Sequence, residues 1–426
     1  MSETHRVPRP AAGRRDRPAT RALIDLLHGL NPQQRAAVTA PPGPVLVLAG
    51  PGSGKTRVLT HRLAYVILEL GADPERVVAL TFTNKAAREM SGRVQALLGQ
   101  AADSSRPRPT LGTFHSFAAR VLRREAARLP VGREFVIFDE ADQQELVRQA
   151  LKELNLDPKQ IQPGAVHAAI SQAKNELVEP TQYPRSSYFA GVSGRVYARY
   201  QQLLQANNAL DFDDLLLWPV RLFRQEPDLL ASYRRRYPHL LVDEFQDTNT
   251  AQYTLLRLLA GEQPDLFVVG DPDQSIYRWR GADYRNVLRL QQDYPNLRTF
   301  LLEQNYRSTQ SILDAAMAVI DRHPDRTRKR LFTERGRGEQ LLFHEAYDPA
   351  DEAGFVVDTI AGLVTAGQAE PRDCAVMYRT NAQSRALEEA FLKAGLPYRL
   401  VGAQRFYGRR EIRDLLAYLR LIHNPS

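Results

Sequence analysis

Short apolar runs alternate with segments of helical periodicity through the first part of the chain. The apolar runs lie at Val45–Ala49, Val77–Phe82 and Leu111–Phe114. Each run is followed by a segment whose apolar residues recur at helical spacing, and these segments are Thr56–Leu70, Asn84–Leu98 and Ser116–Leu129. Strands and helices that alternate in this way predict an α/β fold with a mostly parallel sheet covered by helices.

The middle of the chain has a different pattern. Residues 116–230 are mainly helical in periodicity, with polar breaks at Asp157-Pro158 and Pro184–Gly194 and without buried strand runs. Apolar runs resume at Leu240–Phe245 and Leu266–Asp271. The pattern therefore predicts a helical insertion that interrupts the first sheet in sequence.

A second alternating block begins at Thr299–Asn305 and predicts a second α/β unit. Its expected helices are Thr309–Asp321, Asp351–Val364 and Ala382–Ala394, and its further expected strands are Gln340–Ala346, Ala375–Arg379 and Tyr398–Val401. The last segment, Glu411–His423, has the periodicity of one more helix.

Composition places the 426-residue chain among globular proteins, because 43% of its residues are hydrophobic and 25% are charged. The single cysteine, Cys374, excludes an internal disulfide, and no run approaches the roughly 18 apolar residues of a membrane span. The first residues are rich in proline and arginine without an apolar core, which argues against a secretory signal. We expect a cytoplasmic protein that does not interact with membranes.

The charge balance adds a weaker indication. There are 57 basic and 49 acidic residues, a net charge of +8 and a pI near 9.5. Such a balance is compatible with a polyanionic partner such as nucleic acid. Only seven of the basic residues are lysines, and codon usage explains an arginine excess equally well, so charge alone does not decide the function.

A glycine-rich loop between the first strand and the first helix has the sequence of a P-loop. Its glycines allow backbone N–H groups to surround phosphate oxygens at a helix N-terminus, the lysine reaches the β- and γ-phosphates, and the threonine hydroxyl binds Mg²⁺. The alternative is a strand–helix turn without a ligand. The residues of this candidate site are Ala49, where the usual pattern has glycine, and Gly50, Pro51, Gly52, Ser53, Gly54, Lys55 and Thr56.

Two adjacent acids follow the apolar run Leu240–Val242. We expect Asp243 to hold the metal and Glu244 to activate the attacking water, because successive strand residues point to opposite faces. Together with the P-loop they predict hydrolysis of ATP or GTP.

Eight segments resemble, in order, the motifs of superfamily 1A DNA helicases of the UvrD/Rep/PcrA branch. The resemblance covers residues 22 to 426. The segments are LNPQQRAA (30–37), AGPGSGKT (49–56), LTFTNKAAREM (80–90), GTFHSF (112–117), VDEFQDT (242–248), GDPDQSIYRWRGA (270–282), LEQNYRS (302–308) and YRTNAQSR (378–385).

The resemblance implies two RecA-like motor domains with an ATP site between them. It implies that Gln34 recognises adenine, that Arg57 lies beside the nucleotide and that Tyr306 stacks on the base. It also implies that Gln274 senses the γ-phosphate and that Arg307 acts as an arginine finger. The expected divisions are a flexible basic arm at 1–21, motor domain 1A at 22–115 and 207–297, insertion 1B at 116–206, the first part of motor domain 2A at 298–404 and the start of insertion 2B at 405–426.

Aromatic residues interleaved with arginines in Ser275–Arg280 suit base stacking and phosphate contact on single-stranded DNA without sequence readout. The alternative is that Tyr277 and Trp279 fill a core beneath a loop. By resemblance, Gln246 connects the ATP and DNA sites. The residues expected to contact DNA are Phe82, Thr83, Asn84, Thr113, Phe114, His115, Tyr277, Trp279, Arg280, Tyr378, Arg379 and Asn381.

The function implied is an ATP-dependent 3′→5′ helicase or translocase, with ATP and Mg²⁺, acting on single-stranded DNA and its junctions with duplex. Repair or replication proteins are possible partners. The later motifs of the family, TxHxAKGLE and a final TRA segment, do not occur, which predicts an incomplete second motor domain. Two alternatives stay open: an ATP-dependent DNA-binding fragment that does not unwind, and the helicase part of a RecB/AddA-type helicase-nuclease. The acids at Asp211–Asp214 are expected to be structural.

Overall fold

The computed structural model describes residues 26–99, 107–323, 326, 328–401, 414–415 and 418–419. The expected arm at 1–21 and most of 405–426, with the helix expected at Glu411–His423, lie outside the described residues. The chain divides into two compact units, the first ending at Arg337 and the second beginning at Gly338, and each is described by itself. None of the described helices is both long and apolar enough to cross a membrane.

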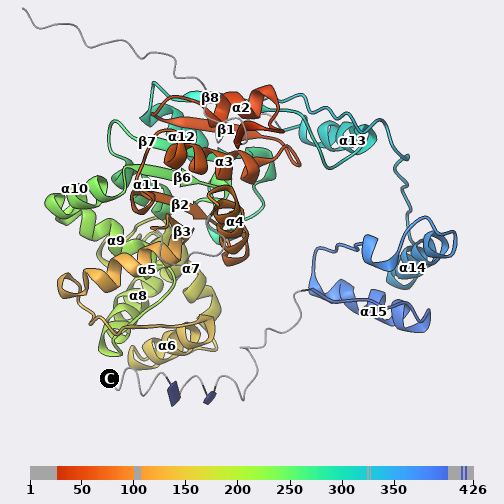
Figure 1. Cartoon of the computed structure of the whole chain (residues 1–426). Helices are drawn as coiled ribbons and strands as arrows, with labels where there is room; N and C mark the ends of the chain where they lie inside the picture. Colours follow the sequence, from red (N-terminus) through yellow and green to blue (C-terminus); the bar gives the residue numbers. More distant parts are fainter. Residues whose placement is uncertain are drawn as a thin grey trace, which may run out of the picture. The chain divides into compact units, whose positions relative to one another are not determined.

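A six-stranded, entirely parallel β-sheet organises the first unit (Figure 1), with strand order β3-β2-β6-β7-β1-β8. The predicted α/β class with a mostly parallel sheet is confirmed. The strands are β1 Val45–Ala49, β2 Val77–Thr81, β3 Thr110–Thr113, β6 His239–Val242, β7 Asp265–Gly270 and β8 Arg298–Leu302.

The side chains of each strand alternate between two hydrophobic cores, one on each face of the sheet. In β1, Leu46 and Leu48 pack in the first core, whereas Val45, Val47 and Ala49 pack in the second. Burial on both faces explains why the strands read as continuous apolar runs. The first core is covered by α5 Phe114–Arg124, α9 Asp214–Gln225, α10 Pro227–Arg236, α11 Thr250–Ala260 and α12 Asn286–Asp293, and the second by α2 Pro32–Val38, α3 Lys55–Leu68 and α4 Asn84–Leu97.

The predicted helical insertion forms a third core. Its helices are α6 Glu140–Glu153, α7 Pro163–Asn175 and α8 Tyr188–Ala206. A two-stranded parallel ladder of β4 (Val136–Ile137) and β5 (Ala209–Leu210) connects the start of the insertion to its end. Strands of two residues are too short for hydrophobic periodicity to reveal.

Strand β8 joins the first sheet, although the sequence pattern assigns it to a second unit starting at 298. It pairs with β1 from Val45 opposite Arg298 to Ala49 opposite Leu302. The edge of β1 that faces away from β7 offers unpaired N–H and C=O groups, and β8 satisfies them. The division between compact units accordingly falls at 337/338. Helix α13, Gln310–Ile320, follows β8.

The second unit contains α14 (Pro349–Thr365) and α15 (Ser384–Lys393), which pack together. Both agree with expected helices. The strands expected at Gln340–Ala346, Ala375–Arg379 and Tyr398–Val401 do not form: the described part of this unit contains no strand. A strand needs a ladder partner, and here the apolar side chains that would face a core, such as Phe343 (87% exposed) and Met377 (94%), lie in solvent.

Candidate active site

The loop between β1 and α3 has the geometry of a phosphate cradle. Gly52 and Gly54 adopt left-handed conformations, with φ of +65° and +89°. The Ser53 hydroxyl donates a hydrogen bond to the Gly50 carbonyl at 2.7 Å, which closes the turn. Helix α3 begins directly after Gly54, so its free N–H groups and positive dipole end favour an anion at the loop.

The segment that follows β8 packs against this loop. The Asn305 amide donates to the Pro51 carbonyl at 2.5 Å, and the Tyr306 N–H donates to the Gly52 carbonyl at 2.9 Å. A Cβ at Gly52 would lie 2.7 Å from Asn305 Nδ2 and 2.8 Å from Arg307 Cβ. The structure therefore brings the predicted nucleotide residues Tyr306 and Arg307 against the P-loop, and Gly52 is required by both its φ and its neighbours.

Replacing Gly52 by alanine is expected to lower the free energy of unfolding by about 1–3 kcal/mol more than the same change at Gly99, because of overpacking. Gly99 is a matched control: its φ is +64°, but a Cβ there meets nothing within 4 Å. Both changes carry the same left-handed strain, so chemical denaturation of the two variants isolates the clash at Asn305 and Arg307. Equal losses would contradict the described packing of the loop.

Lys55 and Gln274 contact each other at the mouth of the loop. Lys55 Nζ donates to Gln274 Oε1 at 3.0 Å. The Gln274 amide in turn donates to the buried carboxylate of Asp271, which forms an ion pair with Lys329. Lys329 was not predicted as a site residue. The only sequence signal is that it is one of seven lysines in an arginine-rich chain.

Thr56 and Asp243 lie together at the carboxyl end of β6. The Thr56 hydroxyl donates to Asp243 Oδ2 at 3.0 Å. Burial, reinforced by the neighbouring Glu244, raises the pKa of Asp243 to about 6, so its negative charge lacks full compensation by the protein. The oxygens of Thr56 and Asp243 are hard ligands of the kind that Mg²⁺ prefers. Mg²⁺ commonly uses one or two protein oxygens together with substrate phosphates. Consistently, the described ranges hold no cluster of three metal-binding side chains.

Gln246 lies between the acid pair and the end of β7. Its amide nitrogen donates to Glu244 Oε2 at 2.9 Å, and its oxygen accepts the Asp271 N–H at 2.9 Å. Glu244 itself has a φ of +51°, a conformation that costs a non-glycine residue energy. The site thus links Glu244 through Gln246 to the segment that carries Gln274.

Gln34 is hydrogen-bonded to the P-loop backbone. It is buried, its oxygen accepts the Asn31 N–H at 3.1 Å, and its amide nitrogen donates to the Ser53 carbonyl at 2.8 Å. Its contacts are therefore with the protein, and adenine recognition stays a prediction. Arg57 lies in the first turn of α3, and the Tyr306 hydroxyl accepts a hydrogen bond from Asn31 Nδ2 at 2.8 Å.

Three aromatic rings form a continuous surface beside this site. The rings of Phe82 and Tyr277 are 5.1 Å apart, and those of Tyr277 and Trp279 are 6.3 Å apart. Trp279 is 67% exposed, which rules out the alternative that it fills a core. Phe82 follows β2, and the other two lie in the loop after β7. The side chain of Arg280 lies outside the described residues.

The remaining residues of the first unit that were predicted to contact DNA include helix caps, buried core residues and an exposed surface residue. Thr83 and Thr113 cap α4 and α5 through their hydroxyls, and Asn84 is exposed at the start of α4. The prediction for Phe114 is wrong: it is 2% exposed and packs in the first core, because it occupies the inward face of α5. His115 lies edge-on against Phe212, and burial lowers its pKa to about 4.

The sequence matches two protein families. Residues 30–295 match the UvrD/REP helicase N-terminal domain, and residues 300–426 match the UvrD-like helicase C-terminal domain. The chain belongs to the UvrD/REP helicase family. The second match shows that the C-terminal family domain is represented in this chain as well.

Relatives of this chain include proteins described as ATP-dependent DNA helicase PcrA. The chain is 49% identical to that of Bacillus subtilis over 403 residues, 94% of this chain and 54% of the relative. The corresponding values are 46%, 94% and 53% for Leuconostoc citreum and 48%, 94% and 54% for Staphylococcus aureus. The chain thus spans about half the length of these relatives.

Three predicted DNA contacts, Tyr378, Arg379 and Asn381, lie in the second unit. Asn381 begins a short 3₁₀ turn, and the N–H groups of Arg379 and Thr380 both donate to Gln383 Oε1. Arg379 and Asn381 are exposed.

A buried ionic cluster attaches the insertion of the helicase to the sheet. Lys174 on α7 is fully buried and lies 2.6 Å from Asp211 and 2.8 Å from Asp214. Desolvation, with Asp211 alongside, raises the pKa of Asp214 to about 6 and that of Asp213 to about 7. The adjacent Asn175 contacts Asp213 and Asn249, the cap of α11. The acids at Asp211–Asp214 thus have a protein cation as their partner.

Proposed function

We propose that this chain is an ATP-driven motor that moves 3′→5′ on single-stranded DNA and acts at its junctions with duplex, in DNA repair or replication restart. One observation carries the proposal. The loop after β7 holds Gln274 against Lys55 and, within five residues, the half-buried Tyr277 and the exposed Trp279. The phosphate partner and the base-stacking residues therefore share one short segment.

The residues divide the work of hydrolysis among them. Lys55 and the first turn of α3 bind the β- and γ-phosphates of ATP. Thr56 and Asp243 would hold Mg²⁺, which when bound neutralises phosphate charge and polarises the γ-phosphoryl group. Glu244, held by Gln246, orients the attacking water and accepts its proton. Arg307, which lies against Gly52, would stabilise the charge that develops in the transition state.

Coupling follows from the Lys55–Gln274 contact. A bound γ-phosphate competes with Gln274 for the ammonium group of Lys55, and Gln274 then reorients with its loop. Because Trp279 lies in the same segment, the grip on a stacked base changes with the nucleotide state.

Directional movement is tested with single-stranded oligonucleotides labelled with a fluorophore at either end. Stopped-flow mixing with ATP is expected to give a delay before arrival at the 5′ label that grows with oligonucleotide length. A length-dependent delay at the 3′ label would contradict the direction. If the chain binds the oligonucleotide in an ATP-dependent way but shows no length-dependent delay at either label, it is a DNA-binding fragment that does not move along DNA.

Trp279→Ala is expected to weaken single-stranded DNA binding by about 1–3 kcal/mol, since stacking of a base on an exposed ring contributes that much. Fluorescence anisotropy with an oligothymidylate measures the change. Tyr188→Ala is the matched control, because Tyr188 is a 76% exposed aromatic residue on α8. If the two variants bind the oligothymidylate with equal affinity, the aromatic surface is not part of the DNA-binding site.

A further inference from the structure

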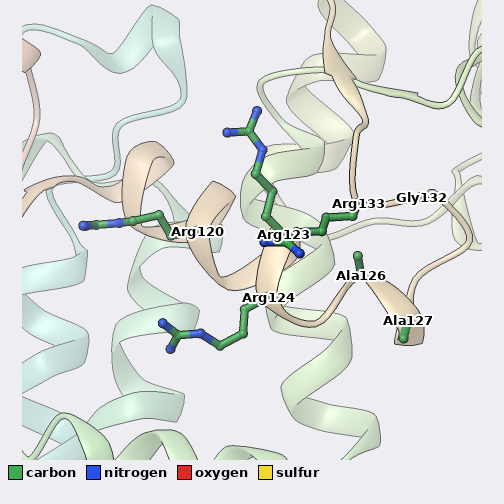
Figure 2. A pocket seen from close by; sticks show the side chains of 7 residues that line it. All are labelled: Arg120, Arg123, Arg124, Ala126, Ala127, Gly132 and Arg133. Carbon is green, nitrogen blue, oxygen red and sulfur yellow. The ribbon is translucent and has the colours of Figure 1, made fainter. Parts of the chain in front are cut away.

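A concave pocket of about 680 Å³ on the first unit is lined by four arginines. Arg120, Arg123 and Arg124 come from α5, and Arg133 comes from the loop that follows. Figure 2 shows Arg120, Arg123 and Arg124 leaving α5 in different directions, with the Arg133 side chain beside Arg123. The rest of the lining is Ala126, Ala127 and Gly132. We call this site the arginine pocket.

The lining of the arginine pocket carries four positive charges and no carboxylate. Within the part of the chain that the structure describes, none of the four guanidinium groups forms an ion pair with a carboxylate. Two acids adjoin these arginines in sequence, Glu125 and Glu134. Glu125 pairs with Arg128 at 3.5 Å and accepts a hydrogen bond from Tyr233. Four like charges around one concavity repel each other, so the pocket favours an anionic ligand.

Two of the guanidinium groups are held in place by neighbouring rings. Arg123 lies over the ring of Phe135 at 5.3 Å, and the Arg124 side chain lies beside those of Tyr233 and Tyr237. Ordering a long side chain before binding reduces the entropy lost when a ligand arrives. The small side chains of Ala126, Ala127 and Gly132 leave the space between the arginines open.

We propose that the arginine pocket binds the phosphodiester backbone of nucleic acid. Guanidinium groups match phosphate oxygens in a bidentate geometry, and the lining offers no aromatic ring on which a base could stack. From Arg120 to Arg124 the helix rises about 6 Å, enough for more than one backbone phosphate. Helix α5 is capped by Thr113 and carries His115 in its first turn. Both residues are expected to contact single-stranded DNA, so one helix would connect the two contacts.

This inference rests on the proposed function, because its ligand is the nucleic acid on which the motor moves. The test compares wild type with the double variant Arg120→Gln/Arg133→Gln. Both residues are exposed, and this choice leaves the ring-packed Arg123 and Arg124 in place. Arg148→Gln/Arg195→Gln removes the same charge from exposed positions of the insertion and is the matched control.

Binding of a single-stranded oligonucleotide of about 30 nucleotides, longer than a site of about 4–16, is measured by anisotropy across a salt series. For the pocket variant, the slope of log affinity against log salt is expected to fall by about 0.7 per lost phosphate contact. Two contacts correspond to an affinity about 25-fold lower at 0.1 M salt, whereas the control variant should change by less than about 2-fold.

The outcomes separate this inference from the proposed function. If wild type does not bind the oligonucleotide, the proposed function fails. If wild type binds and the pocket variant keeps the affinity and salt slope of the control, the arginine pocket does not bind the backbone. Inorganic phosphate is the third probe: a pocket that binds it as tightly as the oligonucleotide holds a free phosphate, and the inference is wrong.

Discussion

Lys55→Ala is expected to lower the rate of ATP hydrolysis by about 100-fold or more, as does loss of one charge-stabilising donor in other active sites. Lys55 places its ammonium group at the mouth of the P-loop, where its Nζ lies 3.0 Å from Gln274 Oε1. Without this ammonium group, no positive charge from Lys55 stabilises the β- and γ-phosphates in the transition state. Steady-state release of phosphate measures the effect.

Single-stranded DNA binding by Lys55→Ala is expected to change far less than the rate of hydrolysis, because the variant loses the Lys55–Gln274 contact but keeps the aromatic surface of Phe82, Tyr277 and Trp279. Lys393→Ala is the control: Lys393 is an exposed lysine at the end of α15 in the second unit. Wild-type turnover by Lys55→Ala would mean that the phosphate site is assigned wrongly.

Lys174→Met is expected to lower the free energy of unfolding by about 3–5 kcal/mol, the cost of leaving a buried charge without its partner. Lys174 is fully buried, and Asp211 and Asp214 lie within 2.8 Å of its ammonium group. Methionine keeps the length of the side chain but removes the charge. Urea denaturation followed by circular dichroism measures the loss.

The matched control for that variant is Lys152→Met, at an exposed position of α6, for which little change is expected. The double variant Lys174→Met/Asp211→Asn should recover part of the lost free energy of unfolding, because it removes one of the two buried carboxylates that Lys174→Met leaves without a cation. If Lys174→Met is as stable as Lys152→Met, the ionic cluster does not hold the insertion to the sheet.

The sheet of the first unit and the P-loop could be predicted because their signals are local. Strands buried on both faces read as unbroken apolar runs, and the Gly50–Thr56 segment contains its own turn, helix start and ligand groups. Asp243 lies beside Thr56 because the P-loop and the end of β6 meet at one edge of the parallel sheet, and the metal role of these two residues stays a prediction.

The contacts that the sequence did not reveal depend on partners far along the chain. Lys329 reaches Asp271 across 58 positions, and Lys174 reaches Asp211 across 37. Phe114 lies within a segment that resembles a DNA-contacting motif, yet its side chain faces the core, because one helical turn presents residues to both sides. In the second unit, alternating apolar positions predicted strands, but a strand also needs a ladder partner.

The coupling of nucleotide and DNA through the loop after β7 is tested most directly by the rate of ATP hydrolysis as single-stranded DNA is titrated into the purified chain with Mg²⁺. The account predicts a saturable increase of about 10-fold, within the usual range of coupling between two sites. The half-maximal concentration should match the dissociation constant measured by anisotropy. A hydrolysis rate that does not respond to DNA that the chain demonstrably binds would contradict the account.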